Sequence, residues 1–313
     1  MGRAGRSGTR ANAPGGLSFG RLTSGSPYPQ SVHSTLISAT DLGVHIDDPL
    51  WTIFDCRHDL GDAQAGARAY AAGHLPGARF AHVDRDLSGP CTGENGRHPL
   101  PDRNVFVQWL SGQGVCEQSQ VVAYDSQGGA YAARLWWMLR WIGHQPVCVL
   151  DGGVAAWQRE GMPLSQHAPA ARNDTPGNLA DRAGVNGVGA GFIEARLGQD
   201  DWRLIDARSP DRFRGENEIL DPVGGHIPGA VNRFFKDNLD AAGNFKPALQ
   251  LSEEFATVLG AIPAKDAVHQ CGSGVTACHN LLAMEVAGLT GSRLYPGSWS
   301  EWCADPGRPV ARG

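Results

Sequence analysis

One cysteine of this sequence lies in a setting that favours its ionisation. Cys271 follows a short strand-like run at 266–269 and opens the helical pattern 275–287, so it stands where a strand passes into a helix. Glycines at Gly272 and Gly274 let the main chain curl around one atom, with the next N–H groups directed at the sulfur. These groups and the helix dipole favour the thiolate, the nucleophilic form of cysteine. The alternative, a packed cysteine beside a tight turn, would not require alternating glycines.

The 7 cysteines do not follow the spacing of a structural framework. Their number is odd and no C-x-x-C pair occurs, which argues against a disulfide scaffold and against a structural zinc site. This usage favours a reducing compartment, where a reactive Cys271 would escape oxidation. Cys278 lies about two helical turns after Cys271. We expect it to be a packed core thiol, because a rigid helix makes a disulfide between the two difficult.

The elements that must position Cys271 occur twice in the chain. Three pairs of segments match in the same order: WTIFDCR at 51–57 with WRLIDAR at 202–208, GHLPGA at 73–78 with GHIPGA at 225–230, and LDGGVAAW at 150–157 with YPGSWSEW at 295–302. Such a repeat predicts two copies of one domain. Within each copy, short apolar runs alternate with amphipathic stretches. This pattern predicts an α/β fold with a parallel sheet flanked by helices on both faces.

The domain boundaries follow from composition. We expect domains at 34–160 and 187–313, joined by a linker at 161–186 that is rich in Ala, Pro, Asn and Gly. Residues 1–33 are rich in Gly, Ser, Pro and Arg and lack the apolar core of a secretory signal. We expect a disordered extension there. A mitochondrial presequence is the alternative, because Arg and Ser without acidic residues are typical of one.

The two copies differ at the position of the nucleophile. Alignment of the run beginning at Val121 with the run beginning at Ala267 places Asp125 opposite Cys271. A carboxylate cannot replace a thiolate as nucleophile, so we expect the first domain to be catalytically silent. Its expected task is to form one wall of the active cleft, because ligand sites favour domain interfaces and the carboxyl ends of parallel strands.

Composition narrows the class of protein further. A hydrophobic content of 41% and a charged content of 19% are typical of a soluble globular chain. The net charge of −5 does not predict a nucleic-acid partner, and no apolar run is long enough to cross a bilayer. A cytoplasmic monomer is therefore the default expectation.

Over about residues 35–310 these features resemble the tandem-domain rhodanese sulfurtransferases. The loop CGSGVTA at 271–277 is similar to that of the members acting on 3-mercaptopyruvate, whereas thiosulfate-preferring relatives usually carry Arg and Lys where Gly272 and Ser273 stand. The resemblance implies that the Cys271 thiolate takes the outer sulfur of the donor and that pyruvate leaves as its enolate. The resulting persulfide passes its sulfur to a thiol, such as thioredoxin or glutathione, or to cyanide. No metal or organic cofactor is implied.

The resemblance also implies the residues that bind the donor. Arg212 occupies the family's substrate-arginine position, and an Arg is the natural clamp for a carboxylate beside a ketone. The family's second Arg, nine positions later, is replaced here by Asp221. Arg208 or Arg214 is the candidate substitute. The remaining predicted contacts come from the loop residues Gly272, Gly274, Val275 and Thr276.

A proton relay is implied as well. In mercaptopyruvate-type members a loop Ser works with a His and an Asp of the first domain, and Ser273 matches that Ser. His74, in the GHLPGA turn, is the candidate His, and Asp62 is the candidate Asp, with Asp59 close by. Such a relay could manage protons at the donor thiol or the leaving enolate. The alternative for His74 is that it braces its turn, because His226 has the same place in the second copy.

Three other functions are alternatives to this interpretation. Cysteine phosphatases need an Arg six positions after the cysteine, where this chain has Ala277. A non-enzymatic sulfur-relay or binding module would not need the intact Cys271 loop and Arg212. A thiosulfate:cyanide sulfurtransferase is the nearest alternative. Its dianionic donor would profit from cationic loop residues, which Gly272 and Ser273 do not supply, so we expect 3-mercaptopyruvate to be the preferred donor.

Overall fold

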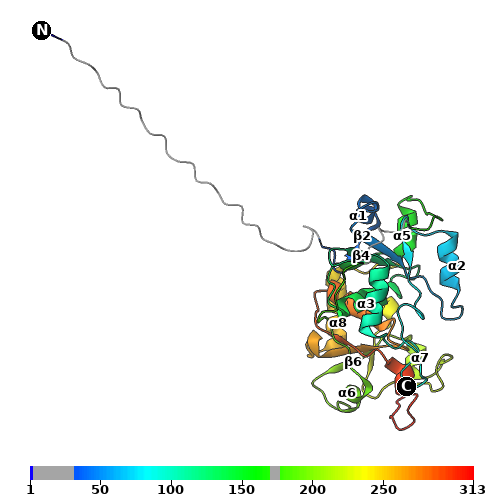
Figure 1. The fold of residues 1–313 in the computed structure, drawn as a ribbon. Helices are drawn as coiled ribbons and strands as arrows, with labels where there is room; N and C mark the ends of the chain where they lie inside the picture. The colour runs from blue at the N-terminus through cyan, green and yellow to red at the C-terminus, as the bar shows by residue number, and fades with distance from the viewer. Residues whose placement is uncertain (3–31, 170–176) are drawn as a thin grey trace.

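The computed structural model describes residues 1–2, 32–169 and 177–313. Within these residues the chain forms two α/β domains in tandem, the first above the second in the view of Figure 1. The expected disordered extension falls almost wholly on residues 3–31, and part of the expected linker falls on 170–176; both stretches lie outside the described residues.

Each domain is built on a parallel sheet. In the described part of the chain the strand order is β1-β5-β4-β2-β3 in the first domain and β7-β6-β8-β9 in the second, and all neighbouring strands are parallel. The bounds are β1 Leu36–Ile37, β2 Trp51–Asp55, β3 Arg79–Phe80, β4 Gln120–Tyr124, β5 Val147–Leu150, β6 Arg203–Asp206, β7 Val231–Asn232, β8 Ala267–Gln270 and β9 Arg293–Leu294. The predicted fold class is therefore confirmed.

Helices cover both faces of each sheet, which explains why the central strands are apolar on both sides. In the first domain the helices are α1 Ala39–Val44, α2 Ala65–Ala72, α3 Arg103–Gly112, α4 Ala132–Trp141 and α5 Gly153–Arg159. In the second they are α6 Ala190–Glu194, α7 Pro210–Arg214, α8 Ala248–Leu259, α9 Ala277–Val286 and α10 Ser298–Trp302, with short 3₁₀ turns at Phe235–Asn238 and Ala264–Asp266. None of the described helices is long and apolar enough to span a bilayer.

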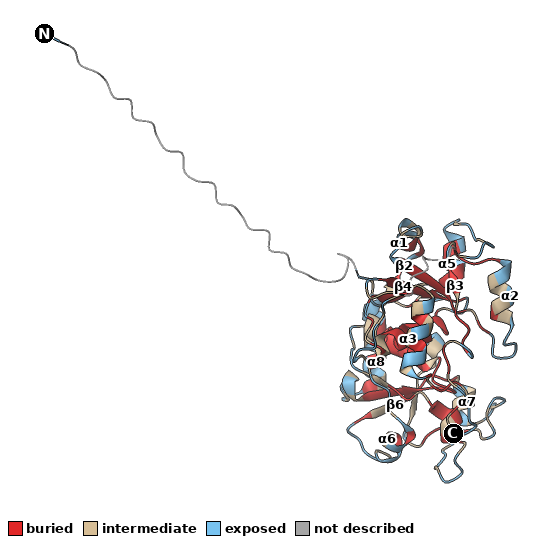
Figure 2. Cartoon of the chain, viewed as in Figure 1, coloured by how far each residue is buried: buried red, intermediate tan, exposed pale blue. Residues whose placement is uncertain are grey.

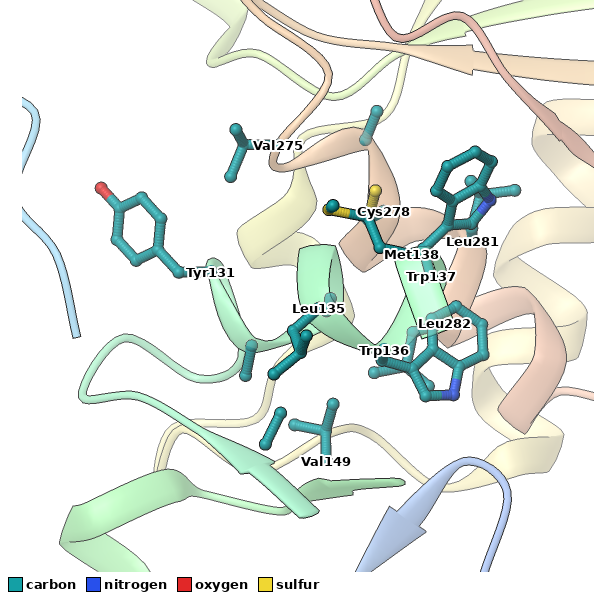
Figure 3. Packing of buried hydrophobic residues seen from close by; sticks show 14 of the residues in the cluster. Tyr131, Leu135, Trp136, Trp137, Met138, Val149, Val275, Cys278, Leu281 and Leu282 are labelled. Carbon is teal, nitrogen blue, oxygen red and sulfur yellow. The ribbon is translucent and has the colours of Figure 1, made fainter. Parts of the chain in front are cut away.

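Two helices join the domains through a shared apolar core. Residues 132–139 of α4 and 277–284 of α9 are buried, as is expected of helices that are covered all round. Figure 2 shows this central layer as largely buried. Figure 3 shows the packing of α4 side chains (Trp136, Trp137 and Met138) with α9 side chains (Cys278, Leu281 and Leu282). Because this interface is as apolar as a domain core, it sets the two domains in one fixed arrangement.

Register places the two nucleophile positions at equivalent points. Tyr124 ends β4 and Gln270 ends β8, and each is paired with the last residue of the neighbouring central strand. Asp125 and Cys271 follow directly. Both therefore lie at the carboxyl end of a central parallel strand, where ligand sites form in such sheets.

Candidate active site

Cys271 lies between β8 and α9 in a loop whose shape depends on glycine. Gly274 has a φ of +75°, and a Cβ atom there would lie 2.2 Å from the carbonyl oxygen of Pro296. No other residue fits this position without distortion. The backbone N–H of Cys271 donates to the Ser298 hydroxyl at 3.1 Å. Pro296 and Ser298, at the start of α10, therefore contact the loop at both points, and Cys271 is only 2% exposed.

In the first domain the equivalent loop binds an anionic side chain through its backbone N–H groups. Asp125 is buried at the position equivalent to Cys271. Its carboxylate accepts four backbone N–H groups at 2.8–3.0 Å, from Gln127, Gly129, Tyr131 and Ala132. This domain thus fills its own anion site and has no nucleophile there. The equivalent loop of the second domain is suited to hold an anionic sulfur on Cys271.

A cavity of about 250 Å³ opens at Cys271 between the two domains. Its lining includes the predicted residues Gly272, Ser273, Val275, Thr276, Arg208 and Arg212. Gly274, which was also predicted to contact the donor, is not among these lining residues and packs against Pro296. The first domain contributes Leu60, Arg97, Gln127, Ala130 and Tyr131. The expectation that the first domain forms one wall of the cleft is confirmed.

Arg212 is oriented by a carboxylate beside the cavity. Its Nε and Nη2 atoms donate to Glu218 at 3.0 and 2.8 Å, and Nη2 also reaches Asp221 at 3.4 Å. Burial would raise the pKa of Glu218, but hydrogen bonds from Leu220 N–H and Arg212 lower it overall. Glu218 therefore stays ionised. Arg212 Nη1 makes no hydrogen bond to any described residue and lies 3.6 Å from where a Cβ of Gly272 would be, so it is available to a ligand.

Ser273 is hydrogen-bonded to a histidine of the first domain. His98 Nδ1 lies 2.7 Å from Ser273 Oγ, and His98 Nε2 lies 2.9 Å from Asp84 Oδ1. The hydrogen bond from His98 lowers the pKa of Asp84, so this carboxylate is ionised and can only accept. A neutral His98 must then carry its proton on Nε2, which leaves Nδ1 to accept the Ser273 hydroxyl proton. The three side chains form a hydrogen-bonded chain from the cavity through the buried His98 to the more exposed Asp84.

Comparison with known proteins gives the family. The rhodanese-like domain matches this chain at residues 38–160 and again at 190–305. The chain belongs to the rhodanese family. A probable 3-mercaptopyruvate sulfurtransferase of Pseudomonas aeruginosa is 46% identical over 89% of this chain and 98% of its own length. A thiosulfate sulfurtransferase of Azotobacter vinelandii is 35% identical over 80% of this chain and 90% of its own length. The structure of 3-mercaptopyruvate sulfurtransferase from Leishmania major superposes with a TM-score of 0.77 at 29% identity, covering 88% of this chain and 75% of the other.

In this rhodanese the hydrogen-bonded chain at Ser273 contains other residues than those predicted. His74 does not reach Ser273. Its Nδ1 contacts the Tyr70 carbonyl at 2.9 Å, and its ring stacks on Tyr70 at 4.0 Å. His226 makes the same pair of contacts with Phe213, at 2.9 and 3.8 Å. Because both domains share this arrangement and only one has a nucleophile, the histidine braces the turn.

Asp62 also lies away from the proposed relay. It is exposed at the N-terminal side of α2 and forms an ion pair with Arg68. Asp59, the neighbouring candidate, uses its carboxylate to accept the N–H of Gly61 at 2.8 Å. Ser273 is therefore hydrogen-bonded to a His and an Asp of the first domain, but these are His98 and Asp84 and not the predicted His74 and Asp62.

Arg208 lines the cavity, but its side chain is only 1% exposed and most of its donors are used within its own domain. Its Nη2 donates to Asp206 and to the Gly225 carbonyl, both at 2.7 Å, and its Nη1 reaches Glu218 at 3.4 Å. Arg57 of the first domain makes equivalent bonds to Asp55 and the Gly73 carbonyl. The repeated contact indicates that Arg208 supports the fold, and its role as a donor clamp stays a prediction. Arg214 is paired with Glu216 at the surface.

A buried arginine of the first domain is hydrogen-bonded to the nucleophile loop. Arg134 of α4 donates to the Gly274 carbonyl at 2.9 Å and to the His98 carbonyl at 3.0 Å. It therefore joins the nucleophile loop to the relay segment across the interface. Burial raises the pKa of Cys278 to about 12, although Arg134 opposes the shift. Cys278 is fully buried, as predicted for a core thiol.

Sequence reasoning missed His98, Asp84, Arg97 and Arg134. The available signal was the run GRHPLP at 96–101, because two prolines keep such a segment extended and place a His and an Arg on a loop.

The side chains around His98 are also of the types that bind a metal ion. Ligand atoms of His58, Asp84 and His98 lie within 4.8 Å of one another. Asp84 and His98 are hydrogen-bonded to each other at 2.9 Å, and this bond accounts for their proximity without a metal.

Proposed function

We propose that this rhodanese moves a sulfane sulfur from 3-mercaptopyruvate to a thiol or to cyanide through a persulfide on Cys271. One observation carries the proposal: Cys271 shares a cavity with Ser273, which is hydrogen-bonded to His98 and through it to Asp84, and with Arg212, whose Nη1 is free among the described residues. The chemistry of this donor requires three things, namely a nucleophile for its sulfur, a cation for its carboxylate and a path for its thiol proton.

Donor cleavage uses these groups together. The Cys271 thiolate attacks the donor sulfur, an S–S bond forms, and the C–S bond breaks with its electron pair passing into the enolate of pyruvate. Ser273 and His98 take the thiol proton of the donor and return it to the enolate carbon. The products are a deprotonated persulfide and pyruvate, so atoms and charge balance. Loop N–H groups stabilise the anion on sulfur, as those of the first domain do for Asp125.

The acceptor step regenerates the enzyme. A thiolate or cyanide attacks the outer sulfur of the persulfide, and the Cys271 thiolate leaves. This step requires an open path to Cys271 and no further group from the protein. We propose thioredoxin, glutathione or cyanide as acceptors, acting on a monomer in the cytoplasm. The free state of the described cysteines suits a reducing compartment.

The alternative donor is thiosulfate, which the name of the Azotobacter relative supports. Thiosulfate is a dianion at neutral pH and has no thiol proton. It would give the Ser273–His98–Asp84 chain nothing to transfer. This difference favours 3-mercaptopyruvate in a chain that has built such a path.

Steady-state kinetics with both donors tests the proposal. We expect a higher kcat/KM with 3-mercaptopyruvate than with thiosulfate. Intact-protein mass spectrometry after exposure to donor without acceptor should find one added sulfur, and peptide mapping should place it on Cys271. Cys271→Ser should add none. Faster turnover of thiosulfate would refute the donor, and a sulfur adduct that persists in Cys271→Ser would refute the nucleophile.

A further inference from the structure

Arg97 reaches the active site from the opposite domain. Its guanidinium pairs through Nη1 with Asp221 of the second domain, and its backbone N–H donates to Ser300 Oγ at 3.0 Å. The side chain lines the cavity and keeps 28% of its surface exposed. Arg97 is therefore held at the domain interface with part of its guanidinium open to the cavity.

Arg97 and Arg212 converge on the same residue of the nucleophile loop. A Cβ atom on Gly272 would lie 2.9 Å from Arg97 Nη2 and 3.5 Å from Arg212 Nη2. Arg97 Nη2 has no hydrogen-bond partner among the described residues. The absence of a side chain at Gly272 thus leaves room for two guanidinium groups beside Cys271.

Asp221 lies between these two cations. Its Oδ1 accepts from Arg97 and its Oδ2 lies 3.4 Å from Arg212 Nη2, with the carboxylate only 3% exposed. Together with Glu218, it brings the local charge of the two-arginine cluster to neutral before a donor binds. A buried carboxylate that bridges two arginines orients both and at the same time weakens their field.

We propose that Arg97 is the second donor-binding arginine of this protein and that Asp221 positions it and sets the charge of donor the cavity accepts. The inference rests on the proposed function and extends it. Asp221 stands where the related enzymes are expected to have an arginine, and the first domain supplies the missing guanidinium from the other side. Free Nη atoms of Arg97 and Arg212 clamp one carboxylate. The fixed negative charge of Asp221 disfavours a dianion such as thiosulfate.

Single substitutions give the first test. Arg97→Ala should lower kcat/KM for 3-mercaptopyruvate about 10- to 100-fold, the usual effect of one lost charge-assisted hydrogen bond, mainly through KM. Arg97→Lys keeps the charge but loses the fork, and should lower it less. Asp221→Asn should raise kcat/KM for thiosulfate about tenfold relative to that for 3-mercaptopyruvate, because one negative charge leaves the cluster. Arg68→Ala, which removes an exposed Arg of a surface ion pair, should change neither donor.

A charge exchange tests the pairing itself. Arg97→Asp and Asp221→Arg should each be impaired, because each leaves like charges facing one another. The double variant, Arg97→Asp with Asp221→Arg, restores an ion pair between the two positions with the charges exchanged. It should recover kcat/KM to within about tenfold of the wild type. A thermal unfolding curve for each variant identifies any that fails to fold, in which case the milder Arg97→Lys and Asp221→Asn variants decide the matter.

Binding of pyruvate separates this inference from the proposed function, because it requires no catalysis. By isothermal titration, Arg97→Ala should raise the Kd for pyruvate about tenfold while Arg68→Ala leaves it unchanged. If Arg97→Ala binds pyruvate and turns over both donors as the wild type does, the inference is overturned and the function stands. If the wild type fails to turn over 3-mercaptopyruvate but Arg97→Ala still weakens pyruvate binding, the function is overturned and the clamp stands.

Discussion

The role of His98 can be measured against a matched control in the same domain. His98→Asn removes the base that contacts Ser273 at 2.7 Å, whereas His74→Asn alters a histidine that is also buried but contacts the Tyr70 and His167 carbonyls. Loss of a positioned general base typically lowers the rate about 10²- to 10⁴-fold, which corresponds to about 2.7–5.4 kcal/mol in activation free energy. We expect a fall of this size for 3-mercaptopyruvate in His98→Asn and a small change in His74→Asn.

The two donors make the test specific. Thiosulfate brings no thiol proton, so His98→Asn should leave its turnover within about threefold of the wild type, a difference of roughly 0.7 kcal/mol. The assay is single-turnover release of pyruvate from 3-mercaptopyruvate and thiocyanate formation from thiosulfate and cyanide. Asp84→Asn should follow His98→Asn, because it removes the carboxylate that orients the ring. An equal fall for both donors, or an equal fall in His74→Asn, would mean that the histidine only braces the loop.

Three further outcomes follow from the same geometry. Arg212→Lys should lower kcat/KM for 3-mercaptopyruvate about tenfold or more at unchanged Tm, since lysine loses the fork that the carboxylate needs; unchanged kinetics would remove Arg212 from the site. Gly274→Ala should destabilise the second domain by at least about 2 kcal/mol in urea unfolding, because its Cβ would lie 2.2 Å from the Pro296 carbonyl oxygen; a wild-type midpoint would contradict the loop geometry. Burial lowers the pKa of His269 to about 3 and that of His279 to about 4. Because the unfolded chain binds protons at these sites from about pH 6.5 downward, stability should be full above that pH and fall by roughly 2 kcal/mol per histidine at pH 5; equal unfolding free energies at pH 7 and pH 5 would count against it.

Local chemistry explains what could be predicted from the residues alone. The Cys271 loop was recognisable because a strand end, two glycines and a helix start are encoded within a few neighbouring residues. The duplication was recognisable because short identical segments recur in order. The same comparison supports the assignment of His74 and Arg208 to structure, since His226 and Arg57 repeat their contacts in the other domain. Such local signals are sufficient to predict the fold but not the whole site.

The relay and the second arginine depend on contacts that no local pattern encodes. Ser273 and His98 are 175 residues apart, and Arg97 and Asp221 are 124 apart. The packing of α4 against α9 brings these residues together. This packing is the sum of many small apolar contacts, and the hydrophobic pattern of one helix does not reveal which helix it packs against. A histidine on an extended loop is chemically equivalent to any other until that interface forms.

The amino-acid sequence by itself determined the two tandem parallel sheets, the silent first domain as an expectation, and the cysteine at a strand-to-helix junction with its arginine at 212. Only the tertiary structure decided which histidine and which aspartate serve Ser273, that Arg208 is committed to the fold, and that Arg97 faces the cavity. The physical reason is the distance along the chain over which each interaction acts. Backbone dihedrals, helix dipoles and hydrophobic alternation act between neighbours in the chain, whereas the site is completed by side chains of a second domain that an apolar interface brings within hydrogen-bonding distance.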